Sequence, residues 1–168
     1  MFTFKEAALA HVKAAEKLLE PEAGFLNENE EVIPILVNLL FQSVELTLKS
    51  FAIEAGLATE QEVRDKRKTR NGHGIEELAI LINTKVGQNK VIDLLLPKRG
   101  FAISNSILNA MVFGMEFKPS RESYATRKIT YGQFGAGQLQ IFGGAKEWVE
   151  AVRCAAENIH SAAGTLNG

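Results

Sequence analysis

Residues 30–56 read EEVIPILVNLLFQSVELTLKSFAIEAG, and this stretch decides the fold class. Its apolar residues recur at the three- and four-residue spacings of an α-helix. They form two stripes, which are Ile33, Val37, Leu40, Val44, Leu48 and Phe51, and Val32, Leu36, Leu39, Leu46 and Ile53. A helix that is apolar around so much of its circumference is buried on most sides. We therefore predict a central helix from Glu30 to Ala55, with Pro34 in its first turns and Gly56 at its end.

A narrow polar stripe interrupts this apolar surface. It consists of Asn38, Gln42, Glu45 and Lys49, at spacings of four, three and four residues. Side chains at these spacings share one face of a helix. Two interpretations stay open, because the stripe is either the one solvent-exposed strip of a central helix or the lining of a polar groove. In the first case Glu45 and Lys49 form an ordinary surface ion pair. In the second they can meet a ligand.

Helical patterns also occur on both sides of this stretch. Thr3 with Glu6 and Thr59 with Glu62 have the spacing of capping boxes, which start helices. The predicted helices run from Thr3 to about Leu19, from Thr59 into a basic segment, from Ile75 through Ile82, from Lys90 to Leu96, from Ser104 to Met115, and from Ala145 to Ala163. Because the connections are short, neighbouring helices should be antiparallel. The sequence thus predicts an all-α, up-and-down helical bundle that forms a single domain over residues 1–168.

Residues 118–144 differ from the rest of the chain. Arg127 to Phe134 and Gln138 to Phe142 flank a glycine-rich centre, and Gly143-Gly144 closes the segment. This pattern is compatible with a short β-hairpin and equally with an ordered loop before the last helix.

The net charge of −1 hides two opposed halves of the sequence. Residues 1–62 carry 11 Asp and Glu against 4 Lys and Arg, whereas residues 63–168 carry 9 against 15. Basic residues in the second half can attract phosphates, and the acidic half can pair with the basic half of the same chain or of another copy.

Several classes of function are disfavoured by the composition. The only cysteine is Cys154, so a disulfide within the chain is excluded, and a reducing, cytoplasmic location is expected. His11, His73 and His160 lack a second histidine or a cysteine at ligand spacing, so we expect no metal. We also expect no cofactor, since no nucleotide-loop fingerprint is complete. No uninterrupted apolar run approaches the length of a membrane span, so no membrane association is expected.

Basic residues gather in Arg64–Arg70, immediately before Gly72-His73-Gly74. The two glycines break the chain just before the helix that starts at Ile75, and the exposed N–H groups of a helix N-terminus favour an anion. A phosphate is therefore a reasonable ligand here. The alternative is an ordinary glycine-rich turn between helices, with His73 as a cap.

Three segments of the sequence resemble the HEPN family of small helical domains. Val44–Gly56 is similar to that family's long central helix, in which a Glu and a Lys lie four residues apart before a glycine. Gly72–Leu78 is similar to its Gly-His step into the next helix, and Arg127–Tyr131 to an Arg/Tyr segment before the last helix. The resemblance implies a helical bundle that is often a homodimer, with a nucleotidyltransferase-type or antitoxin partner, and that binds a nucleotide or RNA.

The leading hypothesis from this resemblance is a non-catalytic bundle that binds a nucleotide or RNA phosphate. Its ligand-binding residues would be Gln42, Glu45, Lys49, Arg70, His73, Arg127 and Tyr131. Lys49, Arg70 and Arg127 would hold phosphate. Tyr131 would stack on a base, and Glu45 would orient Lys49 or accept from a ligand hydroxyl.

Two other functions remain open. HEPN ribonucleases of toxin–antitoxin and defence systems carry an Arg followed by a His at the spacing of Arg67 and His73, which have five residues between them. In a metal-independent endoribonuclease, His73 would be the acid–base group and Arg67 would stabilise the charge on the phosphorus centre. The residues between them lack the apolar positions usual in that motif. The remaining alternative is a structural or adaptor bundle that acts through oligomerisation or a protein partner.

Overall fold

The structure is a computed structural model of the chain, and it describes residues 1–20, 25–65, 74–87, 90–114 and 144–168. Every regular element within these residues is helical, and the elements form a bundle. The predicted all-α class is therefore confirmed for the described part of the chain. The predicted hairpin or ordered loop of residues 118–144 lies outside the described residues, apart from Gly144, which caps the last part of the bundle.

The central helix forms where the sequence predicts it. Helix α3 runs Ile33–Glu54, and the single 3₁₀ turn Glu30–Val32 precedes it, so regular α-helix starts slightly later than predicted. Pro34 lies in the first turn, where its missing N–H has no helical partner to lose. Gly56 follows the helix with a φ of 68°, a left-handed conformation that glycine adopts without strain and that ends the helix.

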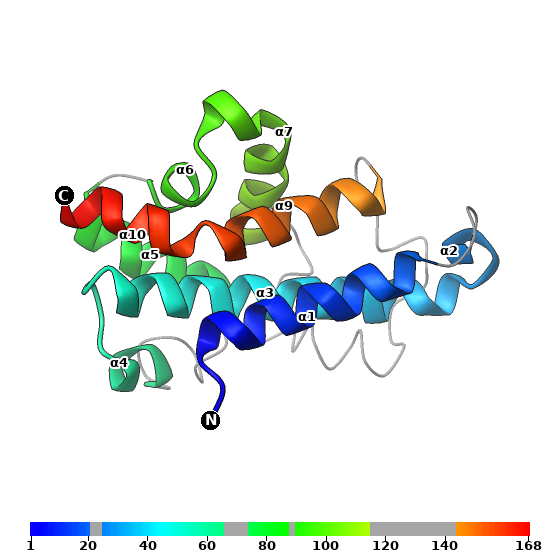
Figure 1. Ribbon diagram of the computed structural model, residues 1–168, viewed down its shortest axis with the longest axis horizontal. Helices are drawn as coiled ribbons and strands as arrows, with labels where there is room; N and C mark the ends of the chain where they lie inside the picture. Colours follow the sequence, from blue (N-terminus) through cyan, green and yellow to red (C-terminus); the bar gives the residue numbers. More distant parts are fainter. Residues whose placement is uncertain (21–24, 66–73, 88–89, 115–143) are drawn as a thin grey trace.

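Three long helical segments run along the bundle (Figure 1). They are α3, α1 (Phe4–Leu19) and α9 (Ala145–Glu157), and each packs against the other two. Helix α1 is antiparallel to α3, as short connections predict, and the small helix α2 (Phe25–Glu28) lies between them in the chain. Helix α9 instead runs in the same direction as α3, so the chain does not alternate strictly up and down.

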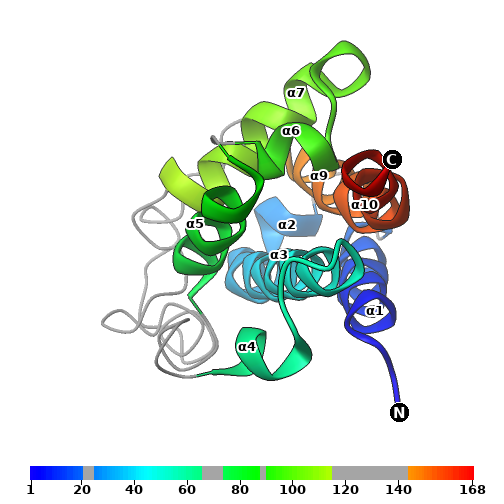
Figure 2. The ribbon, with the colours of Figure 1, turned by 90° about the vertical axis from the view of Figure 1, so that its left-hand side faces the viewer.

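Shorter helices lie on the side of α3 away from α1, against α3 itself and against α9 (Figure 2). They are α5 (Ile75–Val86), α6 (Val91–Leu95) and α7 (Lys98–Asn109), which continues into a π-helical turn at Ala110–Gly114. Helix α4 (Glu60–Arg64) starts at the predicted capping box of Thr59 and Glu62. The prediction that α7 begins at Ser104 is wrong: helical turns start at Lys98 and are interrupted only at Phe101, whose φ is −138°.

The prediction of one continuous last helix is also wrong. Helix α9 ends at Glu157, and α10 (Ile159–Asn167) starts on the other side of Asn158. The Asn158 side chain donates a 2.6 Å hydrogen bond to the carbonyl oxygen of Leu95, at the end of α6. Asparagine is a poor former of helix interiors, so the backbone gains little by continuing the helix here. The hydrogen bond to α6 instead stabilises the break between α9 and α10.

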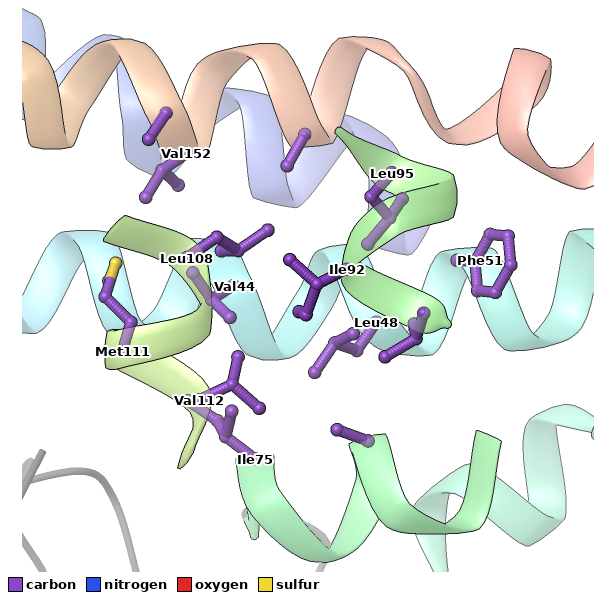
Figure 3. Close-up of a cluster of buried hydrophobic side chains, with 14 of the residues drawn as sticks. Val44, Leu48, Phe51, Ile75, Ile92, Leu95, Leu108, Met111, Val112 and Val152 are labelled. Carbon is purple, nitrogen blue, oxygen red and sulfur yellow. The ribbon is translucent and has the colours of Figure 1, made fainter. Parts of the chain in front are cut away.

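One hydrophobic core joins all the main helices. Figure 3 shows side chains from α3, α5, α6, α7 and α9 pointing toward one another around Leu48 and Ile92. Trp148 of α9 is the largest fully buried side chain. Helix α3 is long and apolar enough to cross a membrane by length and composition, but most of its residues are buried inside the bundle. Its place at the centre of the core accounts for its apolar surface.

Candidate functional site

The polar stripe of α3 is largely covered in the folded chain. Asn38 and Gln42 are half-buried, and the side chains of Glu45 and Lys49 keep only 12% and 7% of their surface exposed. The interpretation of the stripe as a solvent-exposed strip is therefore wrong at its charged end. The reason is the hairpin of α1 and α3, which brings the first turn of α1 over the second half of α3.

Glu45 and Lys49 form a buried ion pair. Lys49 Nζ lies 2.6 Å from Glu45 Oε1, one turn apart on the same helix. Lys49 is the one charged residue among the buried polar residues of the described chain. Taking two charges out of water is costly, and their mutual attraction compensates that cost only when the geometry is close. The pair therefore places a positive and a negative group side by side within a largely buried part of α3.

Phe4 covers this ion pair from α1 and contacts a second cation. The ring of Phe4 has its centroid 5.9 Å from Lys49 Nζ and 4.5 Å from Arg64 Cζ. Both distances are within the range at which the negative face of an aromatic ring attracts a cation. Arg64 is the last residue of α4, so Phe4 brings together charged groups from α3 and α4.

The other end of the stripe serves the packing of α1 on α3. Gln42 Oε1 lies 2.7 Å from Nε2 of His11, and Gln42 Nε2 donates a 3.0 Å hydrogen bond to Asn38 Oδ1. His11 Nδ1 in turn donates to the carbonyl oxygen of Ala7, at 2.7 Å. Because the Gln42 amide is engaged at both its oxygen and its nitrogen, its polar atoms join two helices.

Two further buried polar residues, Asn83 and Asn105, hold helices together, whereas Thr47 does not. Asn83 accepts a 2.9 Å hydrogen bond from the backbone N–H of Val91, and Asn105 donates 2.9 Å bonds to Asp93 and to the carbonyl of Leu96. Both therefore fix connections between helices. Thr47 of α3 differs, because its hydroxyl is buried without a hydrogen-bond partner among the described residues.

Only part of the predicted site can be compared with the structure. The structure places Gln42, Glu45 and Lys49 on one face of α3, as their spacing predicts. The other predicted ligand or catalytic residues are Arg67, Arg70, His73, Arg127 and Tyr131, and these lie outside the described residues.

Sequence reasoning missed the contribution of α1 and α4. The sequence patterns give Phe4 no part in a site and place Arg64 only in a basic segment. A usable signal was present, since the capping box fixes Phe4 in the first turn of α1. An antiparallel α1–α3 hairpin must then place that turn opposite the later turns of α3.

Other reactive groups in the described chain do not form a second site. Burial, together with the hydrogen bond from its sulfur to Glu150 Oε1, raises the pKa of Cys154 to about 11, so the thiol stays protonated at neutral pH and is a poor nucleophile. No group of histidine, cysteine and acidic residues in the described ranges could hold a metal ion.

The comparisons with known proteins find no relative for this arrangement. No family model matches the chain, no curated protein matches it, and no solved structure matches it. The class defined by the fold and site is thus a helical bundle with a buried lysine–glutamate pair on its central helix, and its resemblance to the HEPN family stays a prediction from the sequence.

Proposed function

We propose that this protein is a non-catalytic, HEPN-like helical bundle that binds a nucleotide or RNA through its phosphate. The observation that supports this proposal is the buried Glu45–Lys49 pair of α3, beneath Phe4. A buried ion pair seldom adds stability over apolar residues of the same size, and charged groups in shielded surroundings are frequent at functional sites.

In this proposal Lys49 is the group that contacts phosphate. An ammonium ion shielded from water attracts an anion more strongly than a solvated one does, because the local dielectric constant is lower. Glu45 holds Lys49 in place through the 2.6 Å contact and accepts from a hydroxyl of the ligand. Arg70, His73, Arg127 and Tyr131 complete the proposed site. A cytoplasmic location would supply both kinds of ligand, and a homodimer is the proposed assembly.

Thermal unfolding with and without ligand tests the proposal. The ligands are millimolar ATP, GTP and a short single-stranded RNA, each at low and moderate salt. A ligand that binds only the folded state raises the unfolding midpoint by mass action. We expect a rise with at least one ligand, and we expect it to shrink at higher salt because solvent ions screen the phosphate charges.

Two matched double variants locate the binding. Lys49→Met with Glu45→Gln removes both charges of the buried pair, so neither is left unpaired, and it should abolish the rise. Lys17→Met with Glu20→Gln removes an exposed ion pair of 2.8 Å elsewhere and should preserve the rise. An unchanged rise in the first variant would show that Lys49 is not in the binding site.

The adaptor function is the second candidate, and one surface favours it. The segment Gly100–Phe113 of α7 and the following turn contains no charged residue, and its Ile103 is 71% exposed. Uncharged surfaces with exposed large apolar residues are typical of protein–protein contacts. If no ligand raises the midpoint of the wild-type protein, phosphate binding is refuted and this surface becomes the place to look for a partner.

A further inference from the structure

Arg64 occupies a position that its place in a basic segment does not explain. Its Nε and Nη2 donate to Glu60 Oε1 at 3.0 and 2.8 Å, and its guanidinium lies against the ring of Phe4. Helix α4 is itself anchored, because Val63 is fully buried and the Thr59–Glu62 capping box closes its first turn. The guanidinium therefore contacts both α4 and α1, although its side chain is 54% exposed.

Phe4 is fixed from the other side. Glu6 N–H donates to Thr3 Oγ1 at 3.2 Å, and Glu6 Oε2 accepts from the Thr3 N–H at 2.8 Å. These bonds set the start of α1 and thus the position of the half-buried Phe4 ring. One ring consequently spaces two cations, a buried lysine and an exposed arginine, that come from different helices.

We infer that Arg64 and Phe4 belong to the phosphate-binding site, with Arg64 as its solvent-side cation and Lys49 as its buried one. This inference rests on the proposed function and adds two residues to the site. Among the described residues only Nε and Nη2 of Arg64 have partners, which leaves Nη1 able to donate to a phosphate oxygen. A guanidinium suits this task because its planar donors match a phosphate while its face stacks on the ring.

This geometry has a consequence for the kind of ligand. Each cation pairs with one carboxylate, Lys49 with Glu45 and Arg64 with Glu60, and the multiple negative charge of a phosphate group attracts both cations further. The ring keeps water away from Lys49 without supplying a hydrogen bond of its own. The site should therefore select for the charge of the phosphate group, and a nucleotide, an RNA end and free tripolyphosphate all carry that chemistry.

Binding isotherms of Arg64 variants test the inference. The probes are ATP, tripolyphosphate and a short single-stranded RNA, measured with the full chain. Arg64→Gln should weaken binding of the ligand that the wild type binds by about tenfold, the effect of one charge-assisted hydrogen bond. Arg64→Lys keeps the charge but loses the planar donors and the stacking, so it should recover only part of that loss. Phe4→Leu keeps the apolar bulk and should weaken binding about threefold, as expected for a lost cation–ring contact.

Arg153→Gln is the matched control. Arg153 forms ion pairs with Glu150 of its own helix and with Glu16 of α1, its Nε lying 3.3 Å from Glu16 Oε1. Glu16 is twelve residues from Phe4, about 18 Å along α1 at 1.5 Å per residue. Binding by Arg153→Gln should match the wild type.

The outcomes separate this inference from the proposed function. If the Lys49→Met/Glu45→Gln variant loses binding while Arg64→Gln keeps it, phosphate binding stands and the role of Arg64 is overturned. Equal losses in Arg64→Gln and Arg153→Gln would also overturn it, because they would indicate a general effect of positive charge. A wild-type protein that binds none of the three probes refutes both proposals.

Discussion

The two halves of the polar stripe on α3 have the same spacing but make different kinds of contact. Its first half, Asn38 and Gln42, is uncharged and connects α3 to His11 of α1. Its second half, Glu45 and Lys49, is charged, largely buried and paired within α3 itself. A stripe that looks uniform in the sequence therefore contains a packing contact and a charged pair. Helix α1 contacts the first through His11 and the second through Phe4.

The largest effect expected from this comparison is the loss of one charge of the pair. Lys49→Ala should lower the free energy of unfolding by about 3–5 kcal/mol, because the largely buried Glu45 loses the ammonium group that lies 2.6 Å from it. Urea unfolding measures the change directly. The Lys49→Met/Glu45→Gln variant should regain most of that loss, since no charge is then left uncompensated.

The exposed pair of Lys17 and Glu20 is the control for this prediction. Its side chains are 64% and 60% exposed, and exposed pairs contribute little because water screens them. Lys17→Ala should therefore cost less than about 1 kcal/mol. Similar costs for Lys49→Ala and Lys17→Ala would mean that the Glu45–Lys49 pair behaves as a surface pair in solution.

A smaller effect is expected at the uncharged half. Gln42→Leu should cost about 1 kcal/mol, because His11 Nε2 and Asn38 Oδ1 lose their common partner. The double variant His11→Leu/Gln42→Leu should lose less than the sum of the two single variants, as partners in one hydrogen-bond network do. Urea unfolding of the four proteins gives the coupling energy.

Gln42→Leu also sharpens the definition of the binding site. Since the Gln42 amide is engaged with α1 and Asn38, ligand affinity should be the same in Gln42→Leu and in the wild type. A reduced affinity would return Gln42 to the ligand-binding residues that the sequence predicts.

The fold was predictable where local rules decide it. The apolar stripes of α3, the capping boxes at Thr3 and Thr59, and the left-handed Gly56 all act within one or two turns, and the structure confirms each. The break at Asn158 was not predictable, because its cause is a hydrogen bond to Leu95, which is distant in the chain. Contacts of this kind depend on the packing of helices and leave no periodic signal.

The candidate site was predictable to the same extent. Spacing alone placed Glu45 and Lys49 on one face of α3, because helix geometry fixes it. Whether that face meets water depends on α1, so the burial of the pair and the ring of Phe4 required the three-dimensional arrangement. Sequence patterns therefore identified the charged residues of the site but not the helix and the aromatic ring that bury them.

The smallest expected effect concerns Thr47, which lies between Glu45 and Lys49 along α3. Its hydroxyl is buried without a hydrogen-bond partner among the described residues, and such a group loses its bonds to water on folding. Thr47→Val replaces the hydroxyl by a methyl group of similar size and should raise the free energy of unfolding by about 1 kcal/mol. Thr84→Val on α5 is the control, since that exposed hydroxyl donates a 2.8 Å bond to the Ile80 carbonyl and its removal should not stabilise. Thr47 is on the same helix as the ion pair. A loss of stability in Thr47→Val would show that a buried polar group of α3 stabilises the fold. That result would weaken the case for a functional origin of the buried Glu45–Lys49 pair.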